Sequence, residues 1–154
     1  MTDTQEFWDR LANVRAGLME VDGRLIPMSP NCAPEDGYIW FLTARGTDAA
    51  KAAQSGQEIR FAICDTDAGL HGVVNGTLQL SEDREKLAEV WNFVAASWFE
   101  GGKDDPDLVL VRMTPKTSEL WLSPKSGMVF LYETLKANLT DTQPDMGRHV
   151  TVTF

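Results

Sequence analysis

The sequence predicts a mainly β domain with peripheral helices (α+β), whose antiparallel sheet forms a closed or split barrel. Apolar runs of strand length recur along the chain and are joined mostly by short, hairpin-like connections, which is typical of antiparallel pairing. Stretches with helical spacing separate groups of these runs and do not alternate with every one. Six or seven strands with bends favour a barrel, because closure removes exposed sheet edges.

Length, charge and cysteine usage narrow the class of protein. The 154 residues fit one domain, 1–154, with a full-sized core. A net charge of −9 repels phosphate backbones, which argues against general nucleic-acid binding. No apolar run approaches the roughly 20 residues that span a bilayer, and the acidic N-terminus does not resemble a signal peptide. Cys32 and Cys64 form no C-x-x-C pair, so we expect reduced thiols and a cytoplasmic location.

The first predicted elements are a helix and a hairpin. Residues 4–14 carry an apolar stripe at helical spacing, formed by Phe7, Trp8, Leu11 and Val14. A short strand over 16–21 precedes Asp22-Gly23, a strong hairpin signal, and a return strand follows over 24–28. Because Pro27 cannot donate a hydrogen bond to a ladder, this return strand is expected at a sheet edge or an interruption.

The next predicted unit is a strand that passes through a polar turn into a helix. Residues 38–42 are aromatic, β-branched or apolar, which suits a strand with little water on either face. The helix is expected over about 47–55, with Thr47 or Asp48 as its N-cap.

Two strands are predicted after this helix. Residues 59–64 alternate in polarity, and Cys64 is expected as a small core residue. A longer strand over 70–80 contains Gly72 and Gly76, which are expected to mark bulges or bends.

The C-terminal half begins with a predicted helix over 81–99, for which Ser81 is a cap candidate. Its stripe of Trp91, Val94, Trp98 and Phe99 is expected in the core or at a dimer contact. Further along, the sequence predicts strands over 108–113 and 118–122 around a Thr114-Pro115 turn, a helix over about 129–139, and a last strand near 150–154.

The turn after residues 38–42 combines groups that bind anions. Hydroxyl and basic side chains gather there: Thr43, Arg45, Thr47 and Lys51. A helix N-terminus adds unpaired N–H groups and a partial positive charge, so the segment is a candidate phosphate pocket on an otherwise acidic protein. A simple capped helix with solvated basic residues is the alternative, and the residues alone leave both open.

The sequence shows few signs of a metal site or of a catalytic nucleophile. His71 and His149 have no neighbouring metal ligands in the chain, so we expect no metal site. We find no nucleophile elbow, no phosphate loop with lysine and no serine beside an activating base. If the protein catalyses a reaction, a bound cofactor is therefore expected to carry it.

Four segments together show a family pattern. They are FWDRLANVRAGLM with DGRLIPM, then YIWFLTARGTDAAK, then HGVVNGTLQLSED leading to LAEVWNFVAASWFEGGKDDPDLVLVRMTP, and finally SELW. Their order and spacing resemble the pyridoxamine 5'-phosphate oxidase-like FMN-binding split barrels, in particular the general stress protein 26 type. The resemblance spans nearly the whole chain.

The resemblance implies a six-stranded antiparallel split barrel that forms a homodimer, with FMN in a groove shared between the subunits. Met28 and Ser29 match the strand beside the flavin ring. The segment that holds the phosphate and ribityl chain is matched by Thr43, Arg45, Thr47 and Lys51. Trp121 matches an aromatic position near the cofactor, which the partner subunit can supply.

Two departures from the family pattern concern the phosphate. Many relatives have a basic residue just before the Pro-Met pair, where this chain has Ile26, and the nearest base is Arg24. The gap between Thr47 and Lys51 is one residue longer than usual. Loss of one charge-assisted contact costs about 1.5–3 kcal/mol of binding free energy, so either departure could weaken flavin binding.

The resemblance supports three functional hypotheses. The first is an FMN-dependent oxidoreductase of unknown substrate, linked to stress; pyridoxamine 5'-phosphate oxidase activity itself is not expected, because no second basic cluster is present for a substrate phosphate. The second is a split-barrel binding or stress protein without turnover, holding FMN, a deazaflavin or haem. The third is a dimeric scaffold with an empty groove.

Overall fold

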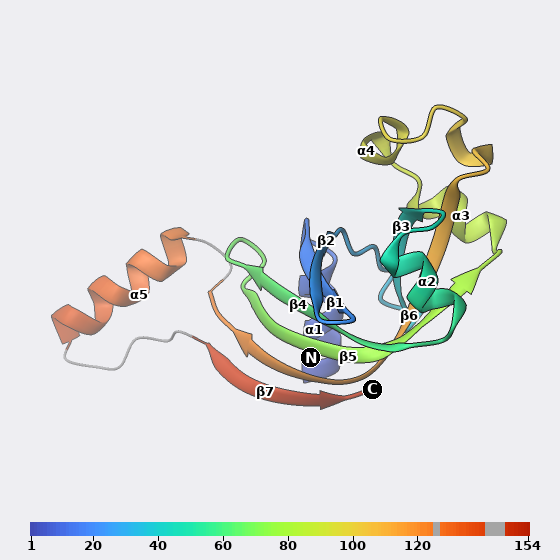
Figure 1. The fold of residues 1–154 in the computed structure, drawn as a ribbon. Coiled ribbons are helices and arrows are strands. Elements are labelled where there is room, and N and C mark those ends of the chain that lie inside the picture. Colours follow the sequence, from blue (N-terminus) through green and yellow to red (C-terminus); the bar gives the residue numbers. More distant parts are fainter. Residues whose placement is uncertain (125–126, 141–146) are drawn as a thin grey trace.

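The computed structural model describes residues 1–124, 127–140 and 147–154, and its main feature is one strongly curved antiparallel sheet (Figure 1). The strands are β1 (Gly17–Val21), β2 (Arg24–Met28), β3 (Ile39–Ala44), β4 (Glu58–Asp65), β5 (Leu70–Ser81), β6 (Leu108–Leu122) and β7 (Arg148–Thr153). The helices are α1 (Asp3–Leu11), α2 (Asp48–Gln54), α3 (Arg84–Val90), α4 (Phe93–Ala96) and α5 (Gly127–Thr140), with a 3-10 turn at Gly102–Asp104.

The sheet is a split barrel. Its strand order is β2-β1-β4-β5-β6-β3, and β7 pairs with the second half of β6, so the described residues form seven strands and not six. In the part of the chain that the structure describes, the end strands β2 and β3 do not pair directly. Asn31, three residues after β2, forms a bridge to Trp40 of β3, and their backbone groups exchange hydrogen bonds of 2.8 and 2.7 Å. The predicted mainly β fold with peripheral helices is therefore confirmed, and the barrel is incompletely closed.

The N-terminal elements form where local sequence signals place them. Thr2 caps α1 in a reciprocal capping box with Gln5. Asp22 and Gly23 have φ angles of 50° and 78°, the left-handed backbone that a tight two-residue hairpin requires. Pro27 lies on β2 at the edge of the sheet, as its missing N–H predicts.

The predicted single helix over 81–99 is wrong. Asp83, and not Ser81, caps α3 by accepting a hydrogen bond from the backbone N–H of Lys86 at 3.0 Å. The chain becomes extended at Trp91, and Asn92 accepts a hydrogen bond from the N–H of Ala95 at 2.9 Å at the start of α4. An Asn side chain that satisfies a new helix start competes with continuation of the old helix, which explains the break.

The helical break changes the expected aromatic stripe. Trp98 is 79 % exposed, so it does not belong to the core of this chain, whereas Trp91 contacts Phe99 with ring centroids 6.3 Å apart. The side chain of Val94 lies outside the described residues. The expectation of a dimer contact at this stripe stays a prediction.

The predicted turn at Thr114-Pro115 is also wrong, because β6 continues through it as one strand. On one edge β6 pairs with β3 up to Met113 and with β7 from Thr117 onward. Pro115 lies between the part of β6 that pairs with β3 and the part that pairs with β7. Its missing N–H therefore removes no hydrogen bond from either pairing. The register with β5 shifts at the same place, next to Gly76, which confirms the predicted bend there.

The barrel interior is filled by alternate side chains of the strands. Phe41 and Phe61 are fully buried, with ring centroids 5.1 Å apart, and Ile63 follows Phe61 on the inner face of β4. The same alternation puts Cys64 on the outer face, where it is exposed, so its predicted core position is wrong. Trp40 points away from this core and joins a smaller cluster under α3.

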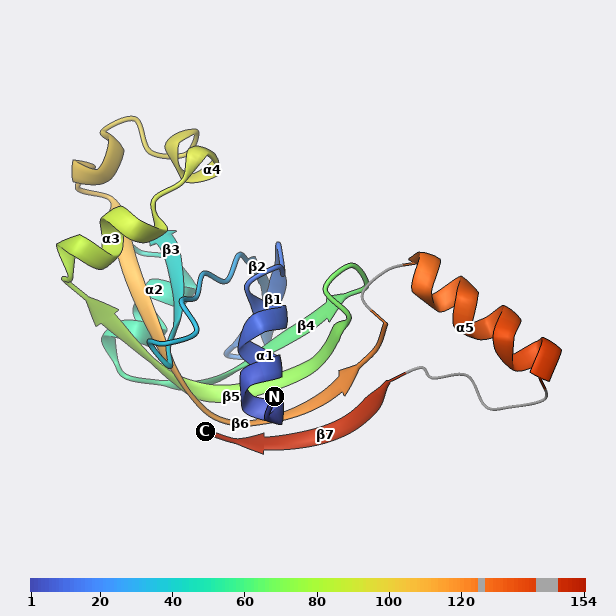
Figure 2. The same cartoon turned by 180° about the vertical axis from the view of Figure 1, so that it is seen from behind.

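The predicted C-terminal helix and last strand are confirmed as α5 and β7. Figure 2 shows α5 lying apart from the sheet, and its exposed apolar residues are Leu131, Tyr132, Leu135 and Leu139. Among the described residues, no helix is both long and apolar enough to cross a bilayer.

Candidate functional site

Two threonine hydroxyls meet where β3 passes into α2. The Oγ1 atoms of Thr43 and Thr47 lie 2.8 Å apart, and the hydroxyl of Thr47 donates to the carbonyl of Ala44 at 2.9 Å. Thr47 also accepts from the N–H of Ala50 at 3.2 Å, as the N-cap of α2. Since a hydroxyl has only one proton, Thr43 must donate to Thr47, and its own lone pairs remain available.

Arg45 and Gly46 form the turn between the two threonines. Gly46 has a φ of 83°, a backbone conformation that glycine adopts without strain. The exposed guanidinium of Arg45 donates through Nη2 to the carbonyl of Pro106 at 2.9 Å, and the backbone N–H of Arg45 donates to Asp107 at 2.7 Å. These bonds anchor the turn to the loop before β6, while no hydrogen bond joins Nη1 to a described residue.

Two further cations lie at or near the start of α2. Lys51 is exposed one helical turn after Thr47, which places the two residues on the same face of the helix. Arg24 of β2 forms an ion pair with Asp48 in the first turn, with Nη1 and Oδ2 2.5 Å apart. The hairpin therefore brings Arg24 beside the candidate phosphate pocket. Arg24 is the basic residue nearest to position 26, where the family pattern has a base and this chain has Ile26.

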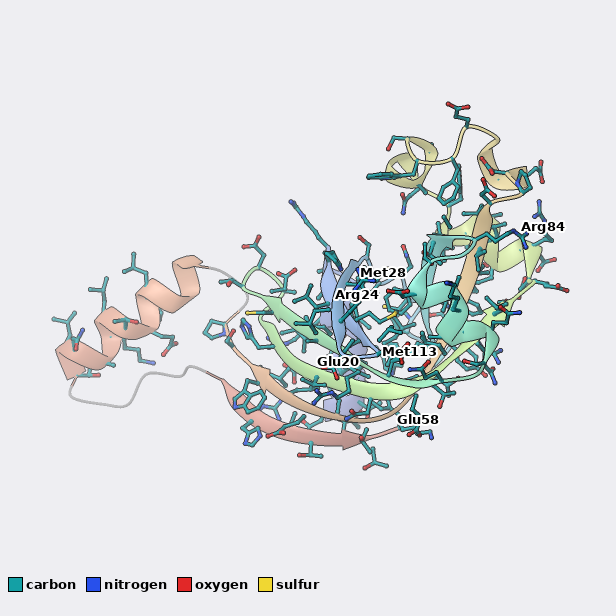
Figure 3. All side chains as sticks on the ribbon, in the orientation of Figure 1. Glu20, Arg24, Met28, Glu58, Arg84 and Met113 are labelled. Carbon is teal, nitrogen blue, oxygen red and sulfur yellow. The ribbon has the colours of Figure 1, made fainter. Side chains whose placement is uncertain are left out.

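One face of β2 leads away from this pocket. Strand alternation puts Arg24, Ile26 and Met28 on the same face, and four residues of strand span about 13 Å. Ile26 and Met28 are half-buried and pack on the main core, whereas Ser29 is exposed just beyond the strand. Figure 3 shows Arg24 and Met28 on the same hairpin.

Trp121 lies at the opposite end of β6 from the β3–α2 turn. Thr43 pairs with Val109 near the start of β6, and Trp121 follows on β6 after about 40 Å of strand contour. Trp121 is 47 % exposed and pairs in register with His71 and His149. The structure thus brings the predicted phosphate residues together at the β3–α2 turn and places Met28 and Ser29 at the end of β2. Trp121 is not among them and lies at the other end of β6.

Two surface hollows lie outside this group of residues. One of about 530 Å³ is lined by Met1, Gln5, Trp8, Asp9, Pro34 and Glu35. The other, of about 290 Å³, starts one residue after Ser29 and includes Asn31, Cys32, Trp40, Lys86 and Glu89. Hydrogen bonds to Asp36 and Glu89 raise the pKa of Lys86 to about 12. None of the seven predicted site residues lines either hollow.

The two cysteines should differ in reactivity. Burial raises the pKa of the Cys32 thiol to about 11, and the nearby carboxylates of Asp36 and Glu35 act in the same direction. Near pH 8 roughly one Cys32 thiol in a thousand is ionised, whereas Cys64 is exposed on β4. We expect iodoacetamide to label Cys64 alone in the native protein, and Cys64→Ser to abolish rapid labelling, as measured by mass spectrometry. Rapid labelling of Cys32 would contradict this assignment.

The structure contains no cluster of three or more metal-ligating side chains within its described ranges. His71 lies 3.1 Å from the hydroxyl of Ser123, and His149 lies 2.9 Å from Glu119. The histidines are on the same row of the sheet but are separated by the strand that carries Trp121.

The split barrel and its hydroxyl-rich, basic β3–α2 turn define a class of proteins. The chain belongs to the family described as pyridoxamine 5'-phosphate oxidase like, which matches residues 2–145. Its resemblance to general stress protein 26 is also shown by a solved structure. No curated protein matches the chain.

Three solved structures illustrate the relationship. A Jannaschia sp. CCS1 protein, provisionally named general stress protein 26, has 50 % identity and a TM-score of 0.93, and the match covers 98 % of this chain and 97 % of that one. The general stress FMN/FAD binding protein of Xanthomonas citri has 27 % identity and a TM-score of 0.70, over 80 % and 90 %. A Clostridium acetobutylicum protein related to general stress protein 26 has 13 % identity and a TM-score of 0.66, over 98 % and 94 %, which shows the shared fold alone.

Two contacts near the predicted site residues could not be found from the sequence. The ion pair between Arg24 and Asp48 joins residues 24 positions apart, and only the hairpin geometry brings them together. The stacking of His149 on Trp121 depends on the pairing of β7 with β6. The alternating residues near the C-terminus predicted the strand but not its partner.

Proposed function

We propose that this protein is a homodimeric flavoprotein that binds FMN non-covalently, with the phosphate at the turn between β3 and α2. The observation that carries the proposal is the meeting of Thr43, Thr47 and Arg45 at the start of α2, with Arg24 alongside. The general stress relative from Xanthomonas citri, described as FMN/FAD binding, supports a flavin.

The donor set fits a phosphate dianion. Thr43 can turn its proton from Thr47 to a phosphate oxygen, and Arg45 has guanidinium hydrogens that no described residue accepts. Lys51 and the partial positive charge of the helix start add attraction. Arg24 can supply the charge that Ile26 lacks, provided that it exchanges Asp48 for the phosphate. Binding at this turn therefore needs no basic residue at position 26.

The flavin ring would then follow β2 toward Met28 and Ser29. From Arg24 beside the turn, β2 runs about 13 Å to Met28 at its end, in the direction that the ring would take. Trp121 of the same chain faces outward, whereas Met28 packs on the core, so a second subunit would provide the indole. Bound FMN would supply electron transfer, and the protein would orient the ring and control its access to water.

The absorption spectrum of the purified protein, followed by FMN titration of the apoprotein, tests this proposal. We expect flavin bands or saturable micromolar binding. We also expect a dimer in solution by sedimentation, because one chain presents only part of the groove. A colourless protein that does not bind FMN would refute the proposal.

Replacing Arg45 or Lys51 by alanine should weaken FMN binding about ten- to a hundredfold in each case, since each removes one charge-assisted contact. Arg60→Ala is a matched control, because Arg60 is exposed on β4 and pairs with Glu20 outside the turn. Equal FMN affinity in Arg45→Ala, Lys51→Ala and Arg60→Ala would show that the phosphate lies elsewhere.

Whether the flavoprotein turns over a substrate is a separate question. We propose an oxidoreductase linked to stress and located in the cytoplasm, which the two cysteines without a disulfide support. The neutral Ile26, packed on the core, favours one alternative: a non-catalytic protein that holds FMN, a deazaflavin or haem. Steady reduction of an electron acceptor by a nicotinamide donor would count against that alternative.

A further inference from the structure

Trp121 and His149 form a flat, exposed stack on the sheet. Their ring centroids are 4.7 Å apart and their planes differ by 6°, a face-to-face arrangement of an imidazole on an indole. No second ring contact of Trp121 is recorded among the described residues. One face of the indole is therefore covered by His149, while 47 % of the residue stays exposed to a further planar group.

The sheet register makes this stack a fixed feature of the outer surface. Trp121 of β6 lies directly opposite His149 of β7, and opposite His71 of β5 on its other side. Its neighbours Leu120 and Leu122 are buried in the barrel, so Trp121 must face outward. Cross-strand partners on one face lie close enough for their side chains to interact.

Glu119 fixes the orientation of the imidazole. Its Oε1 lies 2.9 Å from His149 Nε2, and a carboxylate can only accept, so Nε2 carries the proton. Glu119 and Trp121 lie two residues apart on the same face of β6, so one strand holds both partners of His149. The imidazole is thereby held at two points, its face against the indole and its edge against the carboxylate.

We propose that His149 is a positioning residue that holds the indole of Trp121 flat against the flavin ring bound by the partner subunit. The inference rests on the proposed function, and it adds two residues, His149 and Glu119, to the ring end of the groove. His149 lies beyond residues 2–145, the part that the family pattern matches. Trp121 faces outward from the sheet, because Leu120 and Leu122 are buried, whereas Met28 packs on the core of the same chain. A flavin beside Met28 of its own chain would therefore lie on the other face of the sheet, which leaves the partner's flavin as the occupant.

A held indole favours flavin binding because less side-chain freedom is lost when the complex forms. An exposed Trp with free rotamers must be ordered on binding, whereas a stacked one is already oriented. Stacked aromatic pairs prefer offset, near-parallel planes, which the 6° angle satisfies. The imidazole acts through Trp121 and need not touch the flavin.

The test compares variants of the full-length protein loaded with FMN. His149→Ala should weaken FMN binding roughly two- to tenfold and raise the fluorescence of the bound flavin, because a nearby stacked indole quenches flavin emission. His149→Phe, which keeps a stacking ring but loses the bond to Glu119, should restore most of the quenching. Thr153→Ala is the control, since Thr153 is exposed on the same face of β7.

The outcomes separate this inference from the function on which it rests. Urea unfolding of each apoprotein shows whether a variant merely destabilises β7, because such a loss of stability appears without FMN. If the wild type binds no FMN, the proposed function and this inference both fail. If the wild type binds FMN and His149→Ala matches Thr153→Ala in affinity and flavin fluorescence, only the inference fails. A His149→Phe variant that folds but does not recover quenching also overturns it.

Discussion

Replacing Arg10 by methionine should lower the free energy of unfolding by about 2–4 kcal/mol. Arg10 is only 9 % exposed, and its Nη1 donates to the carbonyls of Gly69 and Ser123 at 2.7 and 2.6 Å. Its Nη2 donates to Glu6 at 2.8 Å. Methionine fills a similar volume but leaves the carbonyl of Ser123 without this donor, and it breaks the tie between α1 and two parts of the sheet.

Urea denaturation followed by tryptophan fluorescence measures this effect. Arg60→Met is the control, because the Arg60 side chain is 58 % exposed and its ion pair with Glu20 should contribute less than about 1 kcal/mol. If the two variants lose the same stability, the buried hydrogen bonds of Arg10 do not have the role that we assign to them.

Replacing Gly69 by alanine should cost about 3–5 kcal/mol of unfolding free energy, from backbone strain and a steric clash together. Gly69 has a φ of +66°, and a Cβ built there would lie 2.4 Å from the carbonyl oxygen of Ser123 and 2.5 Å from Nη1 of Arg10. The new methyl group would therefore displace the guanidinium that joins α1 to the sheet.

Gly56 supplies a matched control for this prediction. It has the same φ of +66°, but a Cβ there meets nothing within 4 Å, so Gly56→Ala should cost only about 1–2 kcal/mol of strain. Equal losses in urea unfolding for the two glycine variants would contradict the clash. Because Arg10→Met removes one of the clashing groups, we expect the double variant Arg10→Met/Gly69→Ala to lose less than the sum of the single losses.

Local signals were sufficient for most of the secondary structure. The Asp22-Gly23 turn, the Thr47 cap and the alternation in β4 each involve residues that are neighbours in the chain. The same holds for the candidate phosphate pocket, since Thr43 to Lys51 form one continuous strand–turn–helix unit. Sequence reasoning failed at α3 and at Pro115, where a competing side-chain cap and a change of strand partner decided the outcome.

The candidate site was predicted only in part. Family resemblance predicts Trp121 as a site residue. The structure adds that Trp121 lies at the opposite end of β6 from the phosphate residues. Arg24 was noted as the nearest base, but its place beside α2 depends on the ion pair with Asp48. The exposure of Cys64 follows from the alternation of side chains along β4. The sequence contains this signal, so the prediction of a core position for Cys64 was avoidable.

The sequence by itself determined the mainly β class, most of the elements and the gathering of hydroxyl and basic groups at one turn, because these depend on periodicity and on contacts between near neighbours. Only the tertiary structure decided what joins the parts. Arg10 meets Ser123 across 113 residues, and His149 meets Trp121 through the pairing of β6 with β7. Such contacts arise when strands distant in the chain become adjacent in the sheet, and no local pattern records which strands these will be.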